Sequence, residues 1–374
     1  MRMEVVVMAA MLGAGALSGA ETALMAVGGY TKAGTTEGIH LFEVNTRTGA
    51  YRFLRAIPGT EQATYLCFNR AGTRLYAAMR DPKNPDGRHA GAVAAFAVND
   101  NHLTLLGIQS VGPTTVPCHL ALDPSEKTLV WAEYTDAFFG TCELDAQGNV
   151  TDRVQRIQDT GDGPNKPRQD KAHAHWAGVT PDGKFLCVND LGIDQVKVID
   201  FKNRANGLRE LAGKTVHTTP GLGPRHLVFH PNGQFAFLIY ELENKVTAFR
   251  YTGEGFVPLQ TLSTLPEGFK GESKAAAIKC SADGTRLFAS NRGHNSIAVF
   301  SINPQTGALA LLTVNPLKGA FPRDFQLLPG ERFMVVGHKL DDNLMVYAYE
   351  AATGKLTPTG EPFPIYHPTC FIFR

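Results

Sequence analysis

One short pattern recurs along the chain of 374 residues and constrains the fold more than any other feature. It is clearest between Gly223 and Phe249, where one apolar run ends at Pro231-Asn232-Gly233 and two further runs follow. A Pro-Asn-Gly triplet between apolar runs is typical of a tight turn between strands. Each copy is therefore predicted to begin with a β-hairpin and to continue into at least one more strand.

The copies can be aligned on the residue that opens the first apolar run, which we call the anchor. The anchors are Tyr65, His119, Trp176, His226, Ala277, Asp324 and Cys370, spaced 46 to 57 residues apart. About four short strands in a unit of roughly 40 to 50 residues are the signature of a β-propeller blade. The chain is therefore predicted to be an all-β, seven-bladed β-propeller.

The two ends of the chain contain complementary parts of one blade. One strand, Cys370–Phe373, follows the last anchor, whereas the N-terminal segment offers three, at Ala23–Val27, Gly38–Val44 and Tyr51–Ala56. We expect the C-terminal strand to pair into this N-terminal blade, because ring closure removes open sheet edges. Residues 21–374 are thus predicted to form a single domain.

Residues 1–20 differ from the rest of the chain. Val5–Leu17 is apolar but too short to span a bilayer, and Ser18-Gly19-Ala20 has the small residues that a signal peptidase recognises. We predict a signal peptide and a periplasmic or secreted mature protein, with a cytoplasmic location if this segment is not a signal. The six cysteines contain no Cys-x-x-Cys pair and are predicted to be buried free thiols.

Composition and motifs exclude several classes of partner. The net charge is +1 and there is no basic block, so nucleic acid is not expected as a partner. The sequence has no Gly-x-Ser-x-Gly elbow, phosphate loop or dinucleotide fingerprint, so neither a serine nucleophile nor a nucleotide cofactor is expected. We predict a protein without cofactor or membrane contact after processing, a monomer or weak dimer that acts on a small molecule.

Polar and charged residues gather where the predicted blades share one rim. In an antiparallel hairpin the start of the first strand lies beside the end of the second, so positions −1 and +15 from each anchor meet there. The −1 residues are Thr64, Cys118, His175, Arg225, Ala276, Arg323 and Thr369. The +15 residues are Arg80, Tyr134, Leu191, Glu241, Arg292 and Lys339. Since first strands line the channel of a propeller, these residues are predicted to converge on one channel mouth.

Two interpretations of this rim are open at this point. The charges could be solvated loop residues on a scaffold that binds protein or glycan. A site is favoured because Arg225, Glu241 and Arg292 each border an apolar run at the same height. The predicted catalytic residues are His175, Arg225, Glu241 and Arg292. The predicted substrate-binding residues are His173, His226, Asp190, Asn291, Arg323 and His338.

His173 and His175 are two residues apart and would lie on the same face of a strand. Such a pair can ligate a metal, but no Cys/His cluster with metal-site spacing accompanies it, and only Asp190 and Glu241 are obvious further ligands. We predict no metal. A catalytic or anion-binding role is favoured for His175, with a structural role as the alternative.

Three blocks of sequence give the chain a family resemblance. They are Lys171–Gly183, Gly223–Gly233 together with Glu241–Asn244, and Ser290–Ser296. They resemble the seven-bladed lactonase family, which includes propeller-type 6-phosphogluconolactonases and fungal 3-carboxy-cis,cis-muconate lactonizing enzymes. The resemblance covers residues 21–374, and it implies a metal-independent site at the four predicted catalytic positions.

The expected reaction is hydrolysis of a sugar lactone of the 6-phosphogluconolactone or gluconolactone type. His175 is the candidate general base, since an unperturbed pKa near ~6.5 suits neutral pH. Arg225 and Arg292 would bind the oxyanion or an anionic substituent, and Glu241 would orient an arginine or the water. Glu241 as the base, with His175 as the acid, is left open by the sequence. So are a muconate-type cyclase and a non-enzymatic scaffold.

Overall fold

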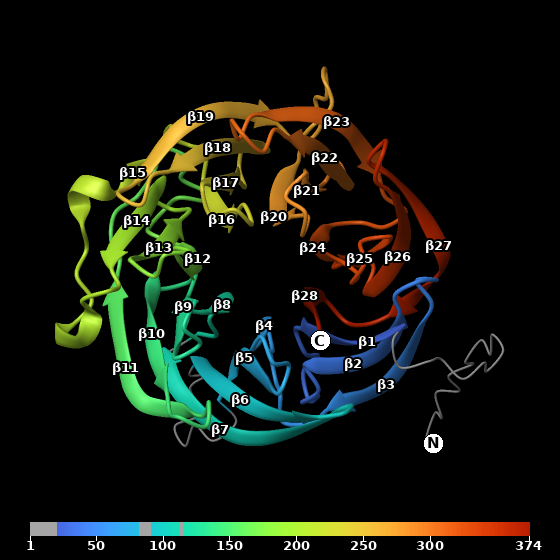
Figure 1. The fold of residues 1–374 in the computed structure, drawn as a ribbon, viewed down its shortest axis with the longest axis horizontal. Coiled ribbons are helices and arrows are strands. Elements are labelled where there is room, and N and C mark those ends of the chain that lie inside the picture. Colours follow the sequence, from blue (N-terminus) through green and yellow to red (C-terminus); the bar gives the residue numbers. More distant parts are fainter. Residues whose placement is uncertain (1–20, 82–90, 113–114) are drawn as a thin grey trace.

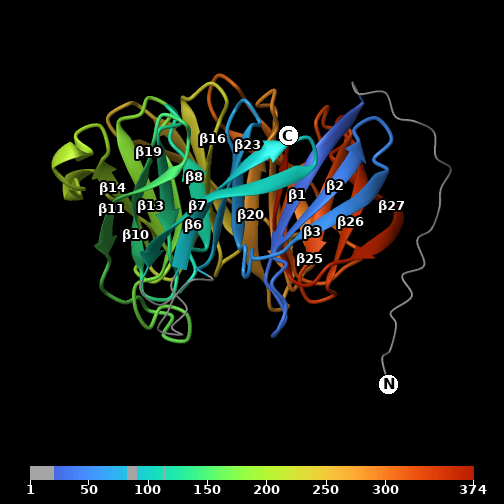
Figure 2. The ribbon, with the colours of Figure 1, turned by 90° about the horizontal axis from the view of Figure 1, so that it is seen from below.

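The computed structural model describes residues 21–81, 91–112 and 115–374, whose strands form a closed ring around a central channel (Figure 1). Seven sheets of four strands make up the ring, as the repeats predict. Each sheet is one blade, and its first strand lies next to the channel. Seen from the side, the ring is a thick disc with strands running between its two faces (Figure 2). The predicted signal peptide, residues 1–20, lies outside the described residues.

Each blade runs outward from the channel through its four strands. Blade 1 consists of β4 (Tyr65–Phe68), β5 (Arg74–Arg80), β6 (Gly91–Asn99) and β7 (His102–Gly112); blade 2 of β8 (His119–Leu122), β9 (Thr128–Ala132), β10 (Phe138–Leu144) and β11 (Val150–Gln158). Blade 3 consists of β12 (Ala174–Val179), β13 (Phe185–Asp190), β14 (Gln195–Asp200) and β15 (Val216–His217); blade 4 of β16 (Pro224–Phe229), β17 (Phe235–Tyr240), β18 (Lys245–Tyr251) and β19 (Phe256–Ser263). Blade 5 consists of β20 (Lys274–Cys280), β21 (Arg286–Arg292), β22 (Ser296–Ile302) and β23 (Leu309–Pro316); blade 6 of β24 (Pro322–Leu327), β25 (Phe333–His338), β26 (Asn343–Glu350) and β27 (Lys355–Pro364). Blade 7 consists of β28 (Pro368–Phe373), β1 (Thr22–Gly29), β2 (Ile39–Asn45) and β3 (Tyr51–Ile57), while two 3₁₀ helices, η1 (Arg204–Asn206) and η2 (Ala212–Lys214), lie between β14 and β15.

The C-terminal strand completes the N-terminal blade, which confirms the predicted closure. β28 pairs antiparallel with β1 through Met25–Phe373, Ala26–Ile372 and Val27–Phe371. The strand also fills space in the core, because Cys370 and Phe371 are buried between blade 7 and its neighbours. The predicted free thiols are confirmed as well, since none of the six cysteines is in a disulfide.

The core lies between neighbouring blades, and this explains why inner strands are apolar on both faces. β17 is buried along its whole length. Phe237 and Ile239 pack toward blade 5, whereas Leu238 and Tyr240, on the opposite face, pack toward blade 3. Alternate side chains of a strand point to opposite faces, so one strand serves two interblade cores.

Five of the seven inner strands have a register shift around the residue before the anchor. In β16, Pro224 pairs with Tyr240 and His226 pairs with Ile239, so Arg225 is an extra residue without a partner. The same shift isolates His175 in β12 and Arg323 in β24, and further shifts occur in β20 and β28. Such a β-bulge turns a side chain out of the regular alternation. The bulges therefore place the −1 residues at the channel.

Candidate active site

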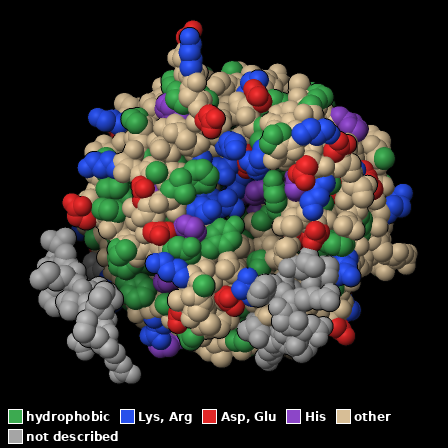
Figure 3. All heavy atoms as spheres, turned by 180° about the vertical axis from the view of Figure 1, so that it is seen from behind, with side chains coloured by type: hydrophobic (Ala, Val, Ile, Leu, Met, Phe, Trp, Pro, Cys, Tyr) green, Lys and Arg blue, Asp and Glu red, His purple; other side chains and the backbone are tan. Residues whose placement is uncertain are grey.

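A pocket of about 620 Å³ occupies one mouth of the channel. Figure 3 shows this face, with a central hollow in which Lys, Arg and His side chains gather. Its lining includes Arg80, Arg168, Lys274, Arg292 and Arg323, and Glu241 is the one acidic residue among the described lining residues. The pocket is therefore a strongly positive cavity, as expected for a site that binds an anion.

The −1 and +15 residues meet here, but not by the simple pairing that the hairpin predicts. The +15 residue faces position −3 across the strands: Arg292 pairs with Lys274, and the Glu241 N–H donates to the Gly223 carbonyl at 2.8 Å. Gly223 has a φ of +64°, and a Cβ there would lie 2.8 Å from the Leu242 side chain. Glycine at this corner thus allows the backbone to bring Arg225 and Glu241 together.

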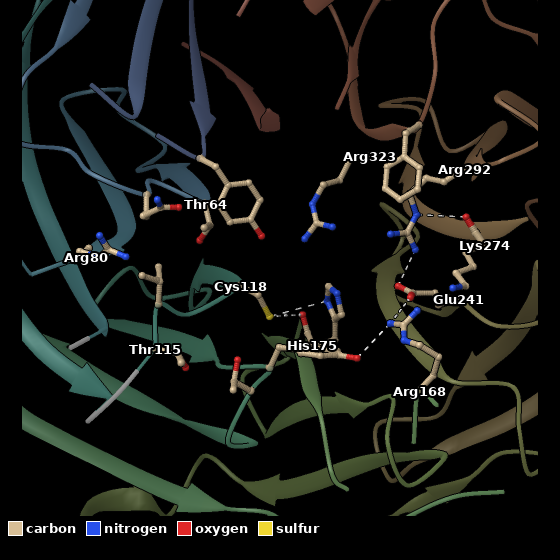
Figure 4. A pocket seen from close by; sticks show the side chains of 16 residues that line it. Thr64, Arg80, Thr115, Cys118, Arg168, His175, Glu241, Lys274, Arg292 and Arg323 are labelled. Carbon is tan, nitrogen blue, oxygen red and sulfur yellow. Dashed lines mark hydrogen bonds and ion pairs between the residues drawn. The ribbon is translucent and has the colours of Figure 1, made fainter. Parts of the chain in front are cut away.

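Glu241 is the centre of the charged cluster. Its Oε2 accepts a hydrogen bond from Arg225 Nε at 3.0 Å and lies 2.7 Å from Arg292 Nη2. Arg168 Nη2 is 2.6 Å from the other oxygen, Oε1 (Figure 4). Glu241, Arg225 and Arg292 are almost completely buried, so three guanidinium groups surround one carboxylate out of contact with bulk water.

The cluster fixes the charge of its members. Burial opposes ionisation of Glu241, but the charges of Arg292, Arg225 and Arg168 outweigh it and hold the pKa of the carboxyl well below its usual value. Burial lowers the pKa of Arg225, as do the charges of Arg292 and Arg323, while Glu241 opposes this shift. Glu241 is therefore an ionised counter-ion at neutral pH and a weak base.

His175 lies between this cluster and the open centre of the pocket (Figure 4). Its Nδ1 is 4.0 Å from Cys118 Sγ, and the Cys118 thiol donates to the His175 carbonyl at 3.4 Å. Burial lowers the pKa of His175 well below the unperturbed value, and the Arg225 charge lowers it further. The imidazole is neutral at neutral pH and can accept a proton. Burial raises the pKa of the neighbouring Cys118 to about 12, so this thiol is not a nucleophile.

Four aromatic rings from blades 1 to 4 close the channel beneath the pocket. Ring centroids are 4.2 Å apart for Tyr65 and His119, 5.4 Å for His119 and His226, and 5.5 Å for His119 and Trp176. The ring of His226 lies 5.1 Å from that of His175, and its Nε2 is 3.1 Å from Arg225 Nη1. The predicted binding residue His226 is thus part of the pocket floor.

The predicted pair of histidines does not share one environment. His173 precedes β12, its ring stacks on Tyr134 at 4.3 Å, and its Nε2 is 3.1 Å from Asp170. The bulge at His175 breaks the two-residue alternation on which the prediction relied. His173 supports the wall of the pocket, and His175 lines it.

Three other predicted binding residues lie outside the pocket lining. The Asp190 carboxylate accepts from the His173 N–H at 2.7 Å and the Gly192 N–H at 2.9 Å, and burial raises its pKa to about 7. The Asn291 side chain donates to the Thr264 carbonyl at 2.7 Å. His338 Nδ1 lies 2.9 Å from the Asn343 amide oxygen. These polar contacts hold strand ends and loops in place.

The sequence interpretation missed Arg168, Tyr30, Phe321 and Lys274, all of which line the pocket. Arg168 comes from the long connection between β11 and β12, and its Nη2 also donates to Tyr134 Oη at 3.1 Å. Tyr30 and Phe321 likewise lie outside the repeating hairpins. Only Lys274, at position −3, had a positional signal, because it faces the +15 residue Arg292.

Comparison with known proteins gives a consistent result along almost the whole chain. A family model described as lactonase, 7-bladed beta-propeller, matches residues 24–373. A Bacillus subtilis protein named 6-phosphogluconolactonase is 34% identical over 352 residues, which cover 93% of this chain and 97% of that protein. A Formosa agariphila protein with the same name is 32% identical over 338 residues, covering 89% and 94%.

Solved structures agree with these sequence matches. The periplasmic gluconolactonase of Pseudomonas aeruginosa superimposes with a TM-score of 0.86 at 28% identity, covering 94% of this chain and 99% of that one. A Lactobacillus plantarum protein superimposes with a TM-score of 0.84 at 32% identity, covering 94% and 99%. Within the described residues, no helix has the length and apolar character required to cross a membrane.

Proposed function

The chain belongs to the lactonase family of seven-bladed β-propellers, and from this premise we propose that it hydrolyses a sugar lactone at the pocket around Glu241. One observation carries the proposal: a neutral, buried histidine lies beside a carboxylate held by three arginines, at the closed end of a positive pocket. This arrangement offers a base, fixed positive charge and limited water in one place.

His175 is the proposed general base. Water attacks the lactone carbonyl carbon as His175 takes its proton, which gives a tetrahedral oxyanion and an imidazolium. The ring C–O bond then breaks, and His175 returns the proton to the departing hydroxyl oxygen. The lowered pKa makes His175 a weak base in the empty pocket, but an anionic substrate would raise this pKa by adding negative charge nearby.

Arg225 and Arg292 are the proposed partners of the oxyanion. Among the described residues, Arg225 Nη2 and Arg292 Nη1 have no hydrogen-bond partner, whereas their other nitrogens bond to Glu241 or to backbone carbonyls. Donors fixed before the reaction stabilise developing charge without reorganisation. Glu241 is therefore proposed to position the arginines, and its lowered pKa favours this role over that of a base.

Substrate and location are proposed together. The positive pocket and the relatives named 6-phosphogluconolactonase favour a phosphorylated sugar lactone, whereas the similar periplasmic gluconolactonase acts, by its name, on a lactone without that group. We propose lactones of this gluconic type as the substrate class, without need for a metal. Export of the mature chain from residue 21 remains our proposal for its location.

The test is hydrolysis of gluconolactone and of its 6-phosphate, each measured above the spontaneous rate. We expect His175→Asn to lower kcat by about 10² to 10⁴, the usual contribution of a general base. Arg225→Lys should lower kcat/KM by about 10² or more, because lysine lacks the planar fork of donors.

The pH profile gives a second readout. Since the base acts in its neutral form and its pKa is lowered, activity should fall only as the pH drops well below ~6.5, and His175→Asn should abolish this limb. His217→Asn, at an exposed histidine of β15, is the control and should match wild type. Equal activity of His175→Asn, Arg225→Lys and wild type would contradict the proposed site.

A further inference from the structure

One side of the pocket contains cations that the Glu241 cluster does not neutralise. Arg323 and Lys339 have no ion-pair partner among the described residues, and both lie against the ring of Tyr30, at 5.9 and 5.3 Å from its centroid. Lys339 also lies 5.9 Å from the centre of the Phe321 ring. We call these four residues the aromatic–cationic corner. Tyr30, Phe321 and Arg323 line the pocket, and Lys339 stands beside them.

The other arginines of the pocket are all paired. Arg168, Arg225 and Arg292 contact Glu241 at 2.6 to 3.0 Å. Arg80 contacts Glu61 at 2.7 Å. The pocket therefore has two chemically different sides, one with its charge balanced by the protein and one with unbalanced positive charge.

The unbalanced charges oppose one another. Burial lowers the pKa of Lys339, and the charges of Arg323 and Arg292 lower it further. Arg323 also contributes to the lowered pKa of Arg225 and of Arg292. Cations held close together without a counter-ion cost free energy, which a bound anion would recover.

The backbone at Phe321 supports a built site. Phe321 has a φ of +63°, in the left-handed region that bulky residues rarely occupy. Two hydrogen bonds hold it there: its N–H donates to the Asn295 side chain at 2.8 Å, and its carbonyl accepts from the Lys339 N–H at 3.1 Å. The strained residue places its ring against both Lys339 and Arg292, which lies 5.0 Å from the ring centre.

We propose that the aromatic–cationic corner binds the anionic substituent of the substrate, a phosphate or carboxylate carried away from the lactone carbonyl. Arg225 and Arg292 would then be reserved for the oxyanion, so recognition and chemistry use different arginines. The proposal rests on the lactonase function, because it divides the pocket between two ends of one substrate. The rings of Tyr30 and Phe321 would exclude water beside the anion and so strengthen its contact with the cations.

Arg323→Gln and Lys339→Gln test this division with paired substrates. Each should lower kcat/KM for 6-phosphogluconolactone by about 10- to 100-fold, mainly through KM, because a hydrogen bond to a charged group is lost. Gluconolactone should be hydrolysed within about twofold of wild type. A sugar lactone with a carboxylate in place of the phosphate distinguishes the two anions. Lys32→Gln removes a cation near Tyr366 on the same side and is the matched control.

Calorimetric binding of the open-chain acids separates this proposal from the lactonase function. Wild type should bind 6-phosphogluconate, or the corresponding dicarboxylic acid, about 10- to 100-fold more tightly than gluconate, and Arg323→Gln should abolish the difference. If binding behaves so but no lactone is hydrolysed, the corner stands and the lactonase function fails. Equal losses for charged and neutral ligands, or no loss for either, would overturn the corner.

Discussion

At the scale of single residues, the site depends on how charges are paired. One carboxylate, that of Glu241, serves three arginines, and the bond network leaves selected guanidinium nitrogens free. The sequence predicted three members, since Arg225, Glu241 and Arg292 border buried strands at one height. It missed Arg168, because that residue lies in a long connection whose path no local pattern determines.

Glu241→Gln should be strongly destabilising. Removing the charge leaves Arg225 and Arg292 buried without a counter-ion, which costs about 3 to 5 kcal/mol of unfolding free energy. Urea unfolding of the purified variant measures this loss. Glu61→Gln is the control, because the ion pair of Glu61 and Arg80 is partly exposed and should contribute less than about 1 kcal/mol. Similar losses in the two variants would contradict the central role of Glu241.

At the scale of elements, the inner strands do more than line the channel. The hairpins, their turns and the order of strands within each blade follow from the repeated apolar runs, and the sequence predicted them. The bulges did not emerge, because an extra residue in a strand changes register without changing composition. This explains why the pairing of His173 with His175 was wrong while the placement of His175 on the channel rim was right.

A buried contact links three inner strands on the side of the channel opposite His175. Asp324 in β24 lies 3.5 Å from Lys279 Nζ in β20, and its other oxygen accepts from the Phe371 N–H in β28 at 3.1 Å. Burial raises the pKa of Asp324, and the Lys279 charge opposes that shift. The contact therefore fixes blades 5, 6 and 7 relative to one another.

A double-mutant cycle on Asp324→Asn and Lys279→Met should reveal this link. Each single change leaves one buried polar group without its partner, whereas the double change removes both charges. We expect the double variant to unfold at a higher urea concentration than additivity predicts, with a coupling of about 0.5 to 3 kcal/mol. Strictly additive losses would show that the two side chains act independently.

At the scale of the whole molecule, the ring is closed by residues from opposite ends of the chain. The sequence predicted this because one end lacked the strand that the other supplied, and β28 occupies that place. The two jobs of the pocket were beyond such reasoning. They depend on Tyr30 and Phe321, which lie outside the repeats and reach the site only through the closed ring.

Deleting residues 368–374 should destabilise the entire ring. The deletion removes β28, exposes the edge of β1 and takes Cys370 and Phe371 out of the core. We expect a melting temperature lower than wild type by many degrees, or no cooperative transition, in thermal unfolding. Adding a peptide of residues 368–374 should restore part of the loss, since it can pair with β1. A truncated chain that melts like wild type would contradict closure by this strand.

The four rings of Tyr65, His119, Trp176 and His226 that floor the pocket have a consequence for turnover. They close the channel below His175, so the ring offers no exit on the far side of the disc. A substrate and its product must pass through the same doorway, one after the other. The open-chain acid keeps the anionic group of the lactone and gains a carboxylate, so it leaves a positive vestibule more slowly than it was formed. Under this geometry the enzyme is restrained by its own accumulated product, and its throughput depends on whatever removes that acid.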